Sequence, residues 1–393
     1  MSRITGATLP ARQLSAFFIL HSAFLAAALA QPADVSASEL RSVVQDAIRI
    51  ASPAIVRIDT VGGAQPVASE GQPPTAGFRQ ADGPTTGVIW TSDGWIVTSS
   101  FNFLRDPSII TVTLHDGRRL VAKLVARDHP NRLALLKVDA TDLPIPQFAA
   151  SSELRVGQRV LVAGFGFSSS APAVSLGVLS ARDRMNGVAL QTDAKTSPAN
   201  YGGPLFDLDG RVLGIVVPLG ASEDEAAGVD WYDSGIGFAI SNEQVNRRLP
   251  RLQKGESLER GLMGIFLETR DPVEGIDTPA STPEDKPKLT IPTDGCLVTL
   301  DPLGPALDAG MRYGDVLLSV DGEPTTRLIH FRRAIAKHAA GDTVNVSWRR
   351  DRETFAAEIK LVTRASLRPP ASQPASGPAD SQPTSEPADV APR

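Results

Sequence analysis

The chain has little with which to crosslink itself, hold a metal or bind nucleic acid. Among its 393 residues there is a single cysteine, Cys296, which excludes an internal disulfide and a thiolate cluster for a metal. The five histidines are scattered without the spacing of metal ligands, so we expect no metal and no cofactor. A net charge of −5 indicates no basic excess, and nucleic acid is not an expected partner. Cys296 lies in the apolar context GCLVTL, which predicts a buried thiol.

Long apolar runs are also scarce, and the longest one lies near the N-terminus. Arg3 and Arg12 precede a largely apolar stretch at residues 14–30 that ends in Ala28-Leu29-Ala30. This order is typical of a secretory signal peptide over residues 1–30, cleaved before Gln31. The alternative is an uncleaved anchor, but the run is shorter than the roughly 20 residues of a spanning helix. We therefore predict a periplasmic or secreted protein with no stable membrane span after cleavage.

The middle of the chain predicts mostly β structure. Residues 36–49 have the periodicity of an amphipathic helix, and residues 61–86 form a long Gly- and Pro-rich loop whose role the sequence does not give. Short apolar runs bounded by turn residues then occur in two sets, one between 87 and 138 and the other between 158 and 240. Regular short strands of this kind favour barrels or sandwiches, and two successive sets favour a double barrel. The Gly164-Phe165-Gly166 run lacks a third glycine and a following helix, so it predicts a turn and not a dinucleotide site.

The C-terminal third reads as a smaller, separate domain. Residues 249–260 form a polar linker, and residues 261–365 combine a strand at 262–269, further strands and a helix at 327–338 in one α+β domain. Residues 366–393 are rich in Pro, Ala and Ser and nearly repeat themselves, which predicts a disordered tail.

Four short segments between residues 94 and 241 carry a recognisable pattern: LALLK, GGPL, DGRVLGI and GIGFAIS. They resemble motifs of trypsin-like serine proteases of the HtrA (high-temperature-requirement) family and set the register of the comparison. The resemblance implies a double six-stranded β-barrel over residues 36–248. In this register the positions of the catalytic His, Asp and Ser hold Phe101, Arg132 and Tyr201. The oxyanion-loop positions hold Ala199, Asn200 and Gly202.

These replacements bear on the chemistry. A Ser-His-Asp site needs a hydroxyl nucleophile, an imidazole to take its proton and a carboxylate to orient the imidazole. A phenyl ring exchanges no proton and a guanidinium has no acceptor. Adjacent glycines at 202–203 let successive N–H groups form an anion-binding nest, although Ala199 resists the backbone a glycine would adopt. As substitutes, Ser99, Ser100, Ser197 and His129 read as ordinary loop residues.

The second domain resembles a PDZ domain of the HtrA type. Residues Leu262, Met263, Gly264 and Ile265 match the carboxylate-binding loop, and GPALDAGMRYGDVLLSVDG at 304–322 matches a longer family stretch. The resemblance implies that a peptide C-terminus adds a strand to the sheet edge while its carboxylate takes backbone N–H groups. Phe331 and Ile335 are candidates for the side-chain pocket, and core packing is an equal interpretation of each.

Together these features predict an exported HtrA-like protein that is not an enzyme. It would bind C-terminal peptides or unfolded proteins, or regulate an active HtrA-type relative, through its PDZ domain. The alternatives are an active serine endopeptidase of envelope protein quality control and a structural envelope protein. HtrA relatives commonly form trimers through aromatic N-terminal contacts, but residues 31–50 contain no aromatic residue, so the oligomeric state stays open.

Overall fold

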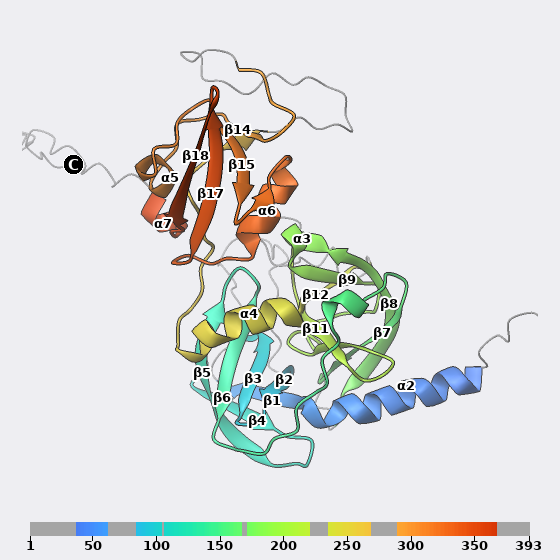
Figure 1. Ribbon diagram of the computed structural model, residues 1–393. Coiled ribbons are helices and arrows are strands. Elements are labelled where there is room, and N and C mark those ends of the chain that lie inside the picture. Colours follow the sequence, from blue (N-terminus) through green and yellow to red (C-terminus); the bar gives the residue numbers. More distant parts are fainter. Residues whose placement is uncertain are drawn as a thin grey trace, which may run out of the picture. The chain divides into compact units, whose positions relative to one another are not determined.

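Two closed barrels and a smaller mixed domain make up the part of the chain that the structure describes (Figure 1). The computed structural model describes residues 37–61, 84–103, 106–166, 171–220, 235–268 and 289–367. These residues fall into two compact units. The first holds both barrels, and the second holds the C-terminal domain from residue 254 together with Arg127–Asn131 and Asp183–Ala189.

The first barrel has six antiparallel strands in the order β1-β2-β3-β6-β5-β4. Its strands are β1 (Ile55–Val61), β2 (Thr85–Thr91), β3 (Trp95–Ser99), β4 (Ile109–Thr113), β5 (Arg119–Asp128) and β6 (Leu133–Val138). The β2–β3 turn requires a glycine, because Gly94 has φ +100° and a Cβ there would lie 2.5 Å from the Val138 carbonyl oxygen. Apolar side chains such as Ile58, Ile89, Phe103 and Leu136 fill the interior.

The second barrel repeats this plan in the order β10-β11-β12-β9-β8-β7. Its strands are β7 (Arg159–Gly164), β8 (Ala173–Asp183), β9 (Ala189–Thr192), β10 (Pro204–Asp207), β11 (Val212–Val217) and β12 (Gly237–Ser241). Short helical turns η1 (Ser52–Ala54), η2 (Ser100–Phe103), η3 (Ser151–Glu153) and α3 (Arg184–Gly187) connect elements of the two barrels. The interior of the second barrel is apolar, and Phe101 of η2 belongs to the same cluster as Leu179, Leu205 and Leu213.

Two helices pack on the barrels of the first unit. Helix α2 (Ala37–Ala51) buries Ala47 and Ala51 in a cluster with Leu161 and Phe206 of the second barrel. Helix α4 (Asn242–Gln253) packs against β11 and β12. The side chain of Asn246 on α4 accepts a 2.7 Å hydrogen bond from Nε1 of Trp90, a residue of β2. Helix α4 therefore contacts strands of both barrels.

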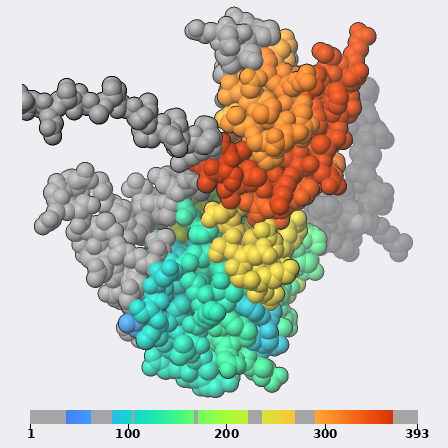
Figure 2. Space-filling model, turned by 90° about the vertical axis from the view of Figure 1, so that its left-hand side faces the viewer, coloured from blue at the N-terminus to red at the C-terminus, as the bar shows by residue number. Residues whose placement is uncertain are grey.

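The C-terminal domain is a sheet with three short helices; its residues from 289 onward are orange to red in Figure 2. Its strands are β13 (Leu267–Glu268), β14 (Cys296–Val298), β15 (Val316–Val320), β16 (Glu323–Pro324), β17 (Thr343–Arg350) and β18 (Glu353–Lys360), and its helices are α5 (Pro305–Asp308), α6 (Leu328–Ala336) and α7 (Arg364–Leu367). The sheet order is β13-β14-β15-β17-β18, with β16 paired to β15. The fully buried Asp315 carboxylate accepts two bonds from Arg350, at 2.7 and 2.8 Å.

The predicted fold class is confirmed: the chain is mostly β, with two closed six-stranded barrels followed by a small α+β domain. The strand expected at 262–269 is shorter and covers Leu267–Glu268, because Gly264 has φ +86° and turns the chain out of extended backbone. Cys296 is buried, as predicted. In the residues that the structure describes, no helix is both long and apolar enough to cross a bilayer. The predicted signal peptide, most of the 61–86 loop and nearly all of the C-terminal tail lie outside the described residues.

Candidate functional site

Residues 193–203 connect β9 to β10 and carry the loop that resembles a nucleophile loop. In this loop each N–H of residues 200–203 has a carbonyl partner. Asn200 donates to Ser197 at 2.9 Å, Tyr201 to Pro198 at 3.3 Å, Gly202 to Val216 at 2.8 Å and Gly203 to Asn200 at 2.8 Å. The prediction of an anion-binding nest is therefore wrong for residues 200–203, because their N–H groups donate to carbonyls in turns and neighbouring strands of the protein itself.

The rings of Phe101 and Tyr201 meet in the core of the second barrel. Their centroids lie 5.5 Å apart with an interplanar angle of 83°, the edge-to-face arrangement that aromatic quadrupoles favour. The two side chains are 4% and 3% exposed. The structure thus brings two of the three predicted triad positions into contact, inside an apolar cluster.

Arg132 joins this region through its backbone. It has φ +56° and stands just before β6. Its carbonyl accepts the N–H of Ser100 at 2.8 Å and the hydroxyl of Ser99 at 3.2 Å. Arg132 therefore fastens the η2 segment that carries Phe101.

Buried polar side chains of the first barrel hold the loop, and the sequence analysis did not identify them. The Tyr201 carbonyl accepts bonds from Thr85 Oγ1 and Asn102 Nδ2, both at 3.1 Å. Thr86 Oγ1 donates to the Ala199 carbonyl at 2.8 Å and accepts the Phe165 N–H at 2.7 Å. The Thr-Thr pair at the start of an otherwise apolar strand was the available signal, because buried hydroxyls need partners.

The other candidate residues have partners of their own. His129 Nε2 lies 3.6 Å from a carboxylate oxygen of Glu259 in the linker. Ser197 donates its hydroxyl to Asn200 Oδ1 at 3.1 Å. Of these, Ser197 lines a pocket beside this loop.

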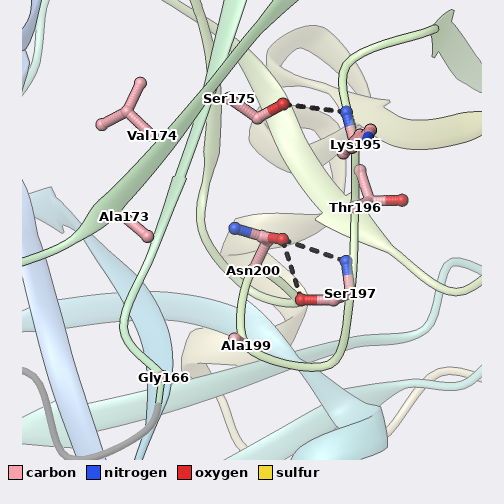
Figure 3. A pocket seen from close by; sticks show the side chains of 9 residues that line it. All are labelled: Gly166, Ala173, Val174, Ser175, Lys195, Thr196, Ser197, Ala199 and Asn200. Carbon is pink, nitrogen blue, oxygen red and sulfur yellow. Dashed lines mark hydrogen bonds between the residues drawn. The ribbon is translucent and has the colours of Figure 1, made fainter.

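That pocket has a volume of about 230 Å³ and lies in the second barrel (Figure 3). Gly166 and residues 173–175 line one side, and residues 195–197 and 199–200 of the loop line the other. Ser175 Oγ accepts the Lys195 N–H at 2.9 Å, which attaches the loop to β8. The pocket thus combines apolar walls with hydroxyl, amide and ammonium groups.

In the C-terminal domain, the predicted carboxylate-binding loop has its carbonyls engaged. Leu262 and Val362 exchange two N–H···O bonds of 2.9 Å. The carbonyls of Met263 and Gly264 accept the N–H groups of Ala306 at 3.0 Å and Leu303 at 2.7 Å. The N–H groups of residues 263–265, by contrast, have no acceptor among the described residues.

Side chains around this loop supply an apolar surface and positive charge. Phe331 and Ile335 on α6 are partly buried against the domain core, so each has a packed side and an exposed side. Arg260, two residues before the loop, has its pKa lowered first by burial and then by the neighbouring charges of Arg332 and Arg364. Like charges held close together make the region attractive to an anion.

Comparisons with known proteins match both parts of the chain. The model of the trypsin-like peptidase domain matches residues 85–215, and the model of the PDZ domain matches residues 261–361. A probable periplasmic serine endoprotease, DegP-like, of Pseudomonas fluorescens is 30% identical, with 89% of this chain and 75% of that protein covered. A DegP-like relative from Chlamydia trachomatis is 33% identical, with 70% of this chain and 53% of that protein covered. The chain spans about half the length of the first curated relatives it matches.

Solved structures of two proteases are also similar to this chain in fold. The HtrA-type protease AlgW with tripeptide has a TM-score of 0.59 at 25% identity, covering 83% of this chain and 98% of that one. The serine endoprotease from Yersinia pestis has a TM-score of 0.53 at 28% identity, covering 81% and 97%.

These comparisons contradict the prediction that the chain is not an enzyme. Relatives that are 30–34% identical over most of the chain are named as serine endoproteases. The prediction was drawn from three side chains, whereas the similarity extends over both barrels and the PDZ domain. The chain therefore belongs to the HtrA family of trypsin-like serine proteases with a C-terminal PDZ domain.

Proposed function

We propose that this protein captures the C-termini of polypeptides in the cell envelope through its PDZ domain. The observation that carries the proposal is the loop at 262–265, where the carbonyls of Met263 and Gly264 are engaged and three successive N–H groups have no acceptor among the described residues. Backbone N–H groups arranged in this way bind a carboxylate, and the adjacent edge strand β13 provides the pairing surface for an extended peptide.

Charge and shape support the same role. Arg260, Arg332 and Arg364 lie close enough for the latter two to lower the pKa of the first, so their positive potential favours an incoming carboxylate. Phe331 and Ile335 offer partly exposed apolar surface on α6 for the last side chain of the peptide. A relative whose structure was solved with a tripeptide is consistent with peptide capture in this family.

The test compares one peptide in two forms, with a free C-terminal carboxylate and with a C-terminal amide. We expect micromolar binding of the acid, about −8 kcal/mol, and clearly weaker binding of the amide, because the carboxylate loses charge-assisted hydrogen bonds. Titration calorimetry on the full chain gives both affinities, and Ile335→Ala should weaken the acid and amide forms by the same factor. Equal affinity for the two forms refutes carboxylate capture.

Serine endoproteolysis is the second candidate, favoured by the names of the relatives. The nucleophile position of the family holds Tyr201, so the acting hydroxyl has to be located by experiment. Ser197 is the serine of this loop that lines the pocket. Labelling with a fluorophosphonate, alongside cleavage of casein, identifies a reactive serine, and Ser197→Ala and Ser175→Ala show which pocket hydroxyl is labelled. Cleavage that survives both variants assigns the reaction to another residue.

Export is the remaining part of the proposal. The relatives are named as periplasmic, and the N-terminal stretch ends in a small-residue cleavage motif before Gln31. N-terminal sequencing of the protein from the cell envelope should return a chain that starts at Gln31. A chain that still starts at Met1 would favour a retained anchor.

A further inference from the structure

The pocket lined by Ser197 and Asn200 contains hydrogen-bond donors that the described residues do not use. Asn200 is 8% exposed, and its Oδ1 accepts both the N–H and the hydroxyl of Ser197, at 3.0 and 3.1 Å. Because an N–H must face an oxygen, these bonds determine which way the amide points. Its NH₂ group therefore points away from Ser197, as Figure 3 shows. This NH₂ group has no acceptor among the described residues.

Close packing against the end of β7 determines the position of the Asn200 side chain. A Cβ placed on Gly164 would come within 2.9 Å of Asn200 Nδ2 and 2.5 Å of the Ala199 carbonyl oxygen. A glycine at 164 is therefore required for the side chain of Asn200 to occupy this place, at the end of β7. A nearly buried donor pair held in this way is preorganised for an acceptor.

The other groups around the pocket also favour an acceptor that carries negative charge. Lys195 lines it, whereas none of its described lining residues is acidic. Asp193, the nearest acidic residue along the loop, uses Oδ1 to accept the Val178 N–H at 2.6 Å. Ala173, Val174 and Ala199 supply apolar walls for methylene groups.

We propose that this pocket binds a carboxylate of a polypeptide, with Asn200 Nδ2 donating to one oxygen and Lys195 supplying the counter-charge. The volume of about 230 Å³ corresponds to roughly eight water molecules, which suits one acidic side chain or a chain terminus. The inference depends on the proposed handling of polypeptides, and it gives the barrels a preference for acidic segments that is separate from the PDZ groove.

The experiment uses the full chain and three labelled peptides of one sequence. Two carry a C-terminal amide and differ in a central Glu or Gln, and the third carries the central Gln with a free C-terminus. The two amidated peptides have no C-terminal carboxylate for the PDZ loop to bind. The difference in affinity between their Glu and Gln forms therefore reports on the pocket in the barrels. Fluorescence anisotropy should show about tenfold tighter binding of the Glu peptide, because charge-assisted bonds are replaced by neutral ones in the Gln form.

Variants locate the effect. Asn200→Asp keeps the acceptor for Ser197 and replaces the NH₂ group by a negatively charged oxygen, so the advantage of the Glu peptide should disappear. Lys195→Gln should reduce it, whereas Lys123→Gln, which removes the same charge from an exposed position on β5, should leave it unchanged. Lys195 is also exposed, so its variant keeps the test valid if Asn200→Asp fails to fold.

Equal binding of the Glu and Gln amides to the unaltered protein overturns the proposal, as does an advantage that survives both pocket variants. The free-acid Gln peptide, measured on the Gly264→Ala variant, distinguishes a terminal carboxylate from a side-chain carboxylate as the occupant. Failure of PDZ capture would appear as equal acid and amide binding at the PDZ loop and would leave the Glu-against-Gln comparison intact.

Discussion

Two tight turns of this protein have similar glycine-containing sequences, but they differ in whether their backbone N–H groups are already hydrogen-bonded. The turn at 199–203 and the loop at 262–265 each contain a left-handed glycine, Gly202 with φ +89° and Gly264 with φ +86°. In the first turn the N–H groups of residues 200–203 all donate to carbonyls of the protein. In the second, the carbonyls of Met263 and Gly264 are paired and the N–H groups of residues 263–265 have no acceptor among the described residues.

The difference follows from what surrounds each turn. The first turn is held by buried side chains such as Thr86 and Asn102, which take up its carbonyls, and by neighbouring strands and turns, which take up its N–H groups. The second turn lies beside β13, at one end of the sheet order, where backbone can remain unpaired. A glycine therefore permits an anion-binding turn, and the neighbouring elements decide whether its donors are available.

The largest expected effect comes from removing the ring beneath the first turn. Phe101→Ala leaves a cavity next to Tyr201 in the core of the second barrel and should lower the free energy of unfolding by about 3–5 kcal/mol. Urea unfolding followed by fluorescence measures it. Phe101→Leu, which keeps most of the volume, should cost less than about 1.5 kcal/mol. Similar losses for both variants would mean that the ring contact is not what supports the turn.

A smaller effect is expected from the hydroxyl that ties three segments of the first turn together. Thr86→Val leaves the Ala199 carbonyl and the Phe165 N–H without their partner; the buried Phe165 N–H should cost about 1–3 kcal/mol, and the half-buried Ala199 carbonyl less, because water can reach it. Thr86→Ser keeps both hydrogen bonds and serves as the matched control. Thermal unfolding should rank the serine variant well above the valine variant, and the reverse order would contradict the assignment.

At the second turn, Gly264→Ala should weaken binding of a free-acid peptide by tenfold or more. The added Cβ would lie 2.0 Å from the Leu303 carbonyl oxygen, and a left-handed alanine is strained by about 1–3 kcal/mol. Gly310→Ala is the control, since Gly310 has φ +85° and open space around its Cβ position. The Gly310→Ala variant has the backbone strain of a left-handed alanine but no steric clash, so its peptide affinity should be unchanged. Equal loss in both variants would attribute the effect to general destabilisation.

The smallest expected effect concerns pH and the PDZ core. Burial raises the pKa of the Cys296 thiol to about 12, whereas an unfolded chain ionises its cysteine near 8.5. Between these values the folded state retains a proton that the unfolded state releases, so stability should fall as pH rises, by about 1 kcal/mol at pH 9. Comparing the pH slope of unfolding with that of Cys296→Ala isolates this contribution, and parallel slopes would exclude it.

Sequence patterns predicted the architecture well because strand alternation and turn residues are local properties. The double barrel and the buried Cys296 follow from short segments, whereas the PDZ domain was predicted from motifs that resemble that family. The anion nest was predicted from Gly202 and Gly203, and it fails because hydrogen-bond partners such as Val216 lie far along the chain. Thr85, Thr86 and Asn102 were missed for the same reason, since their role depends on contacts between the two barrels. The enzyme class was misjudged because three positions were weighed against similarity that extends over most of the chain.

The sheet edges have a consequence for the proposed capture of polypeptides. Both barrels are closed, so their strands offer no row of unpaired backbone on which a foreign strand could extend the sheet. The two end strands of the PDZ sheet differ in length: β13 covers Leu267–Glu268 among the described residues, whereas β18 covers Glu353–Lys360. A polypeptide segment that pairs with these two residues of β13 gains few backbone bonds, which favours rapid release and gives little template for the growth of an aggregate at that edge.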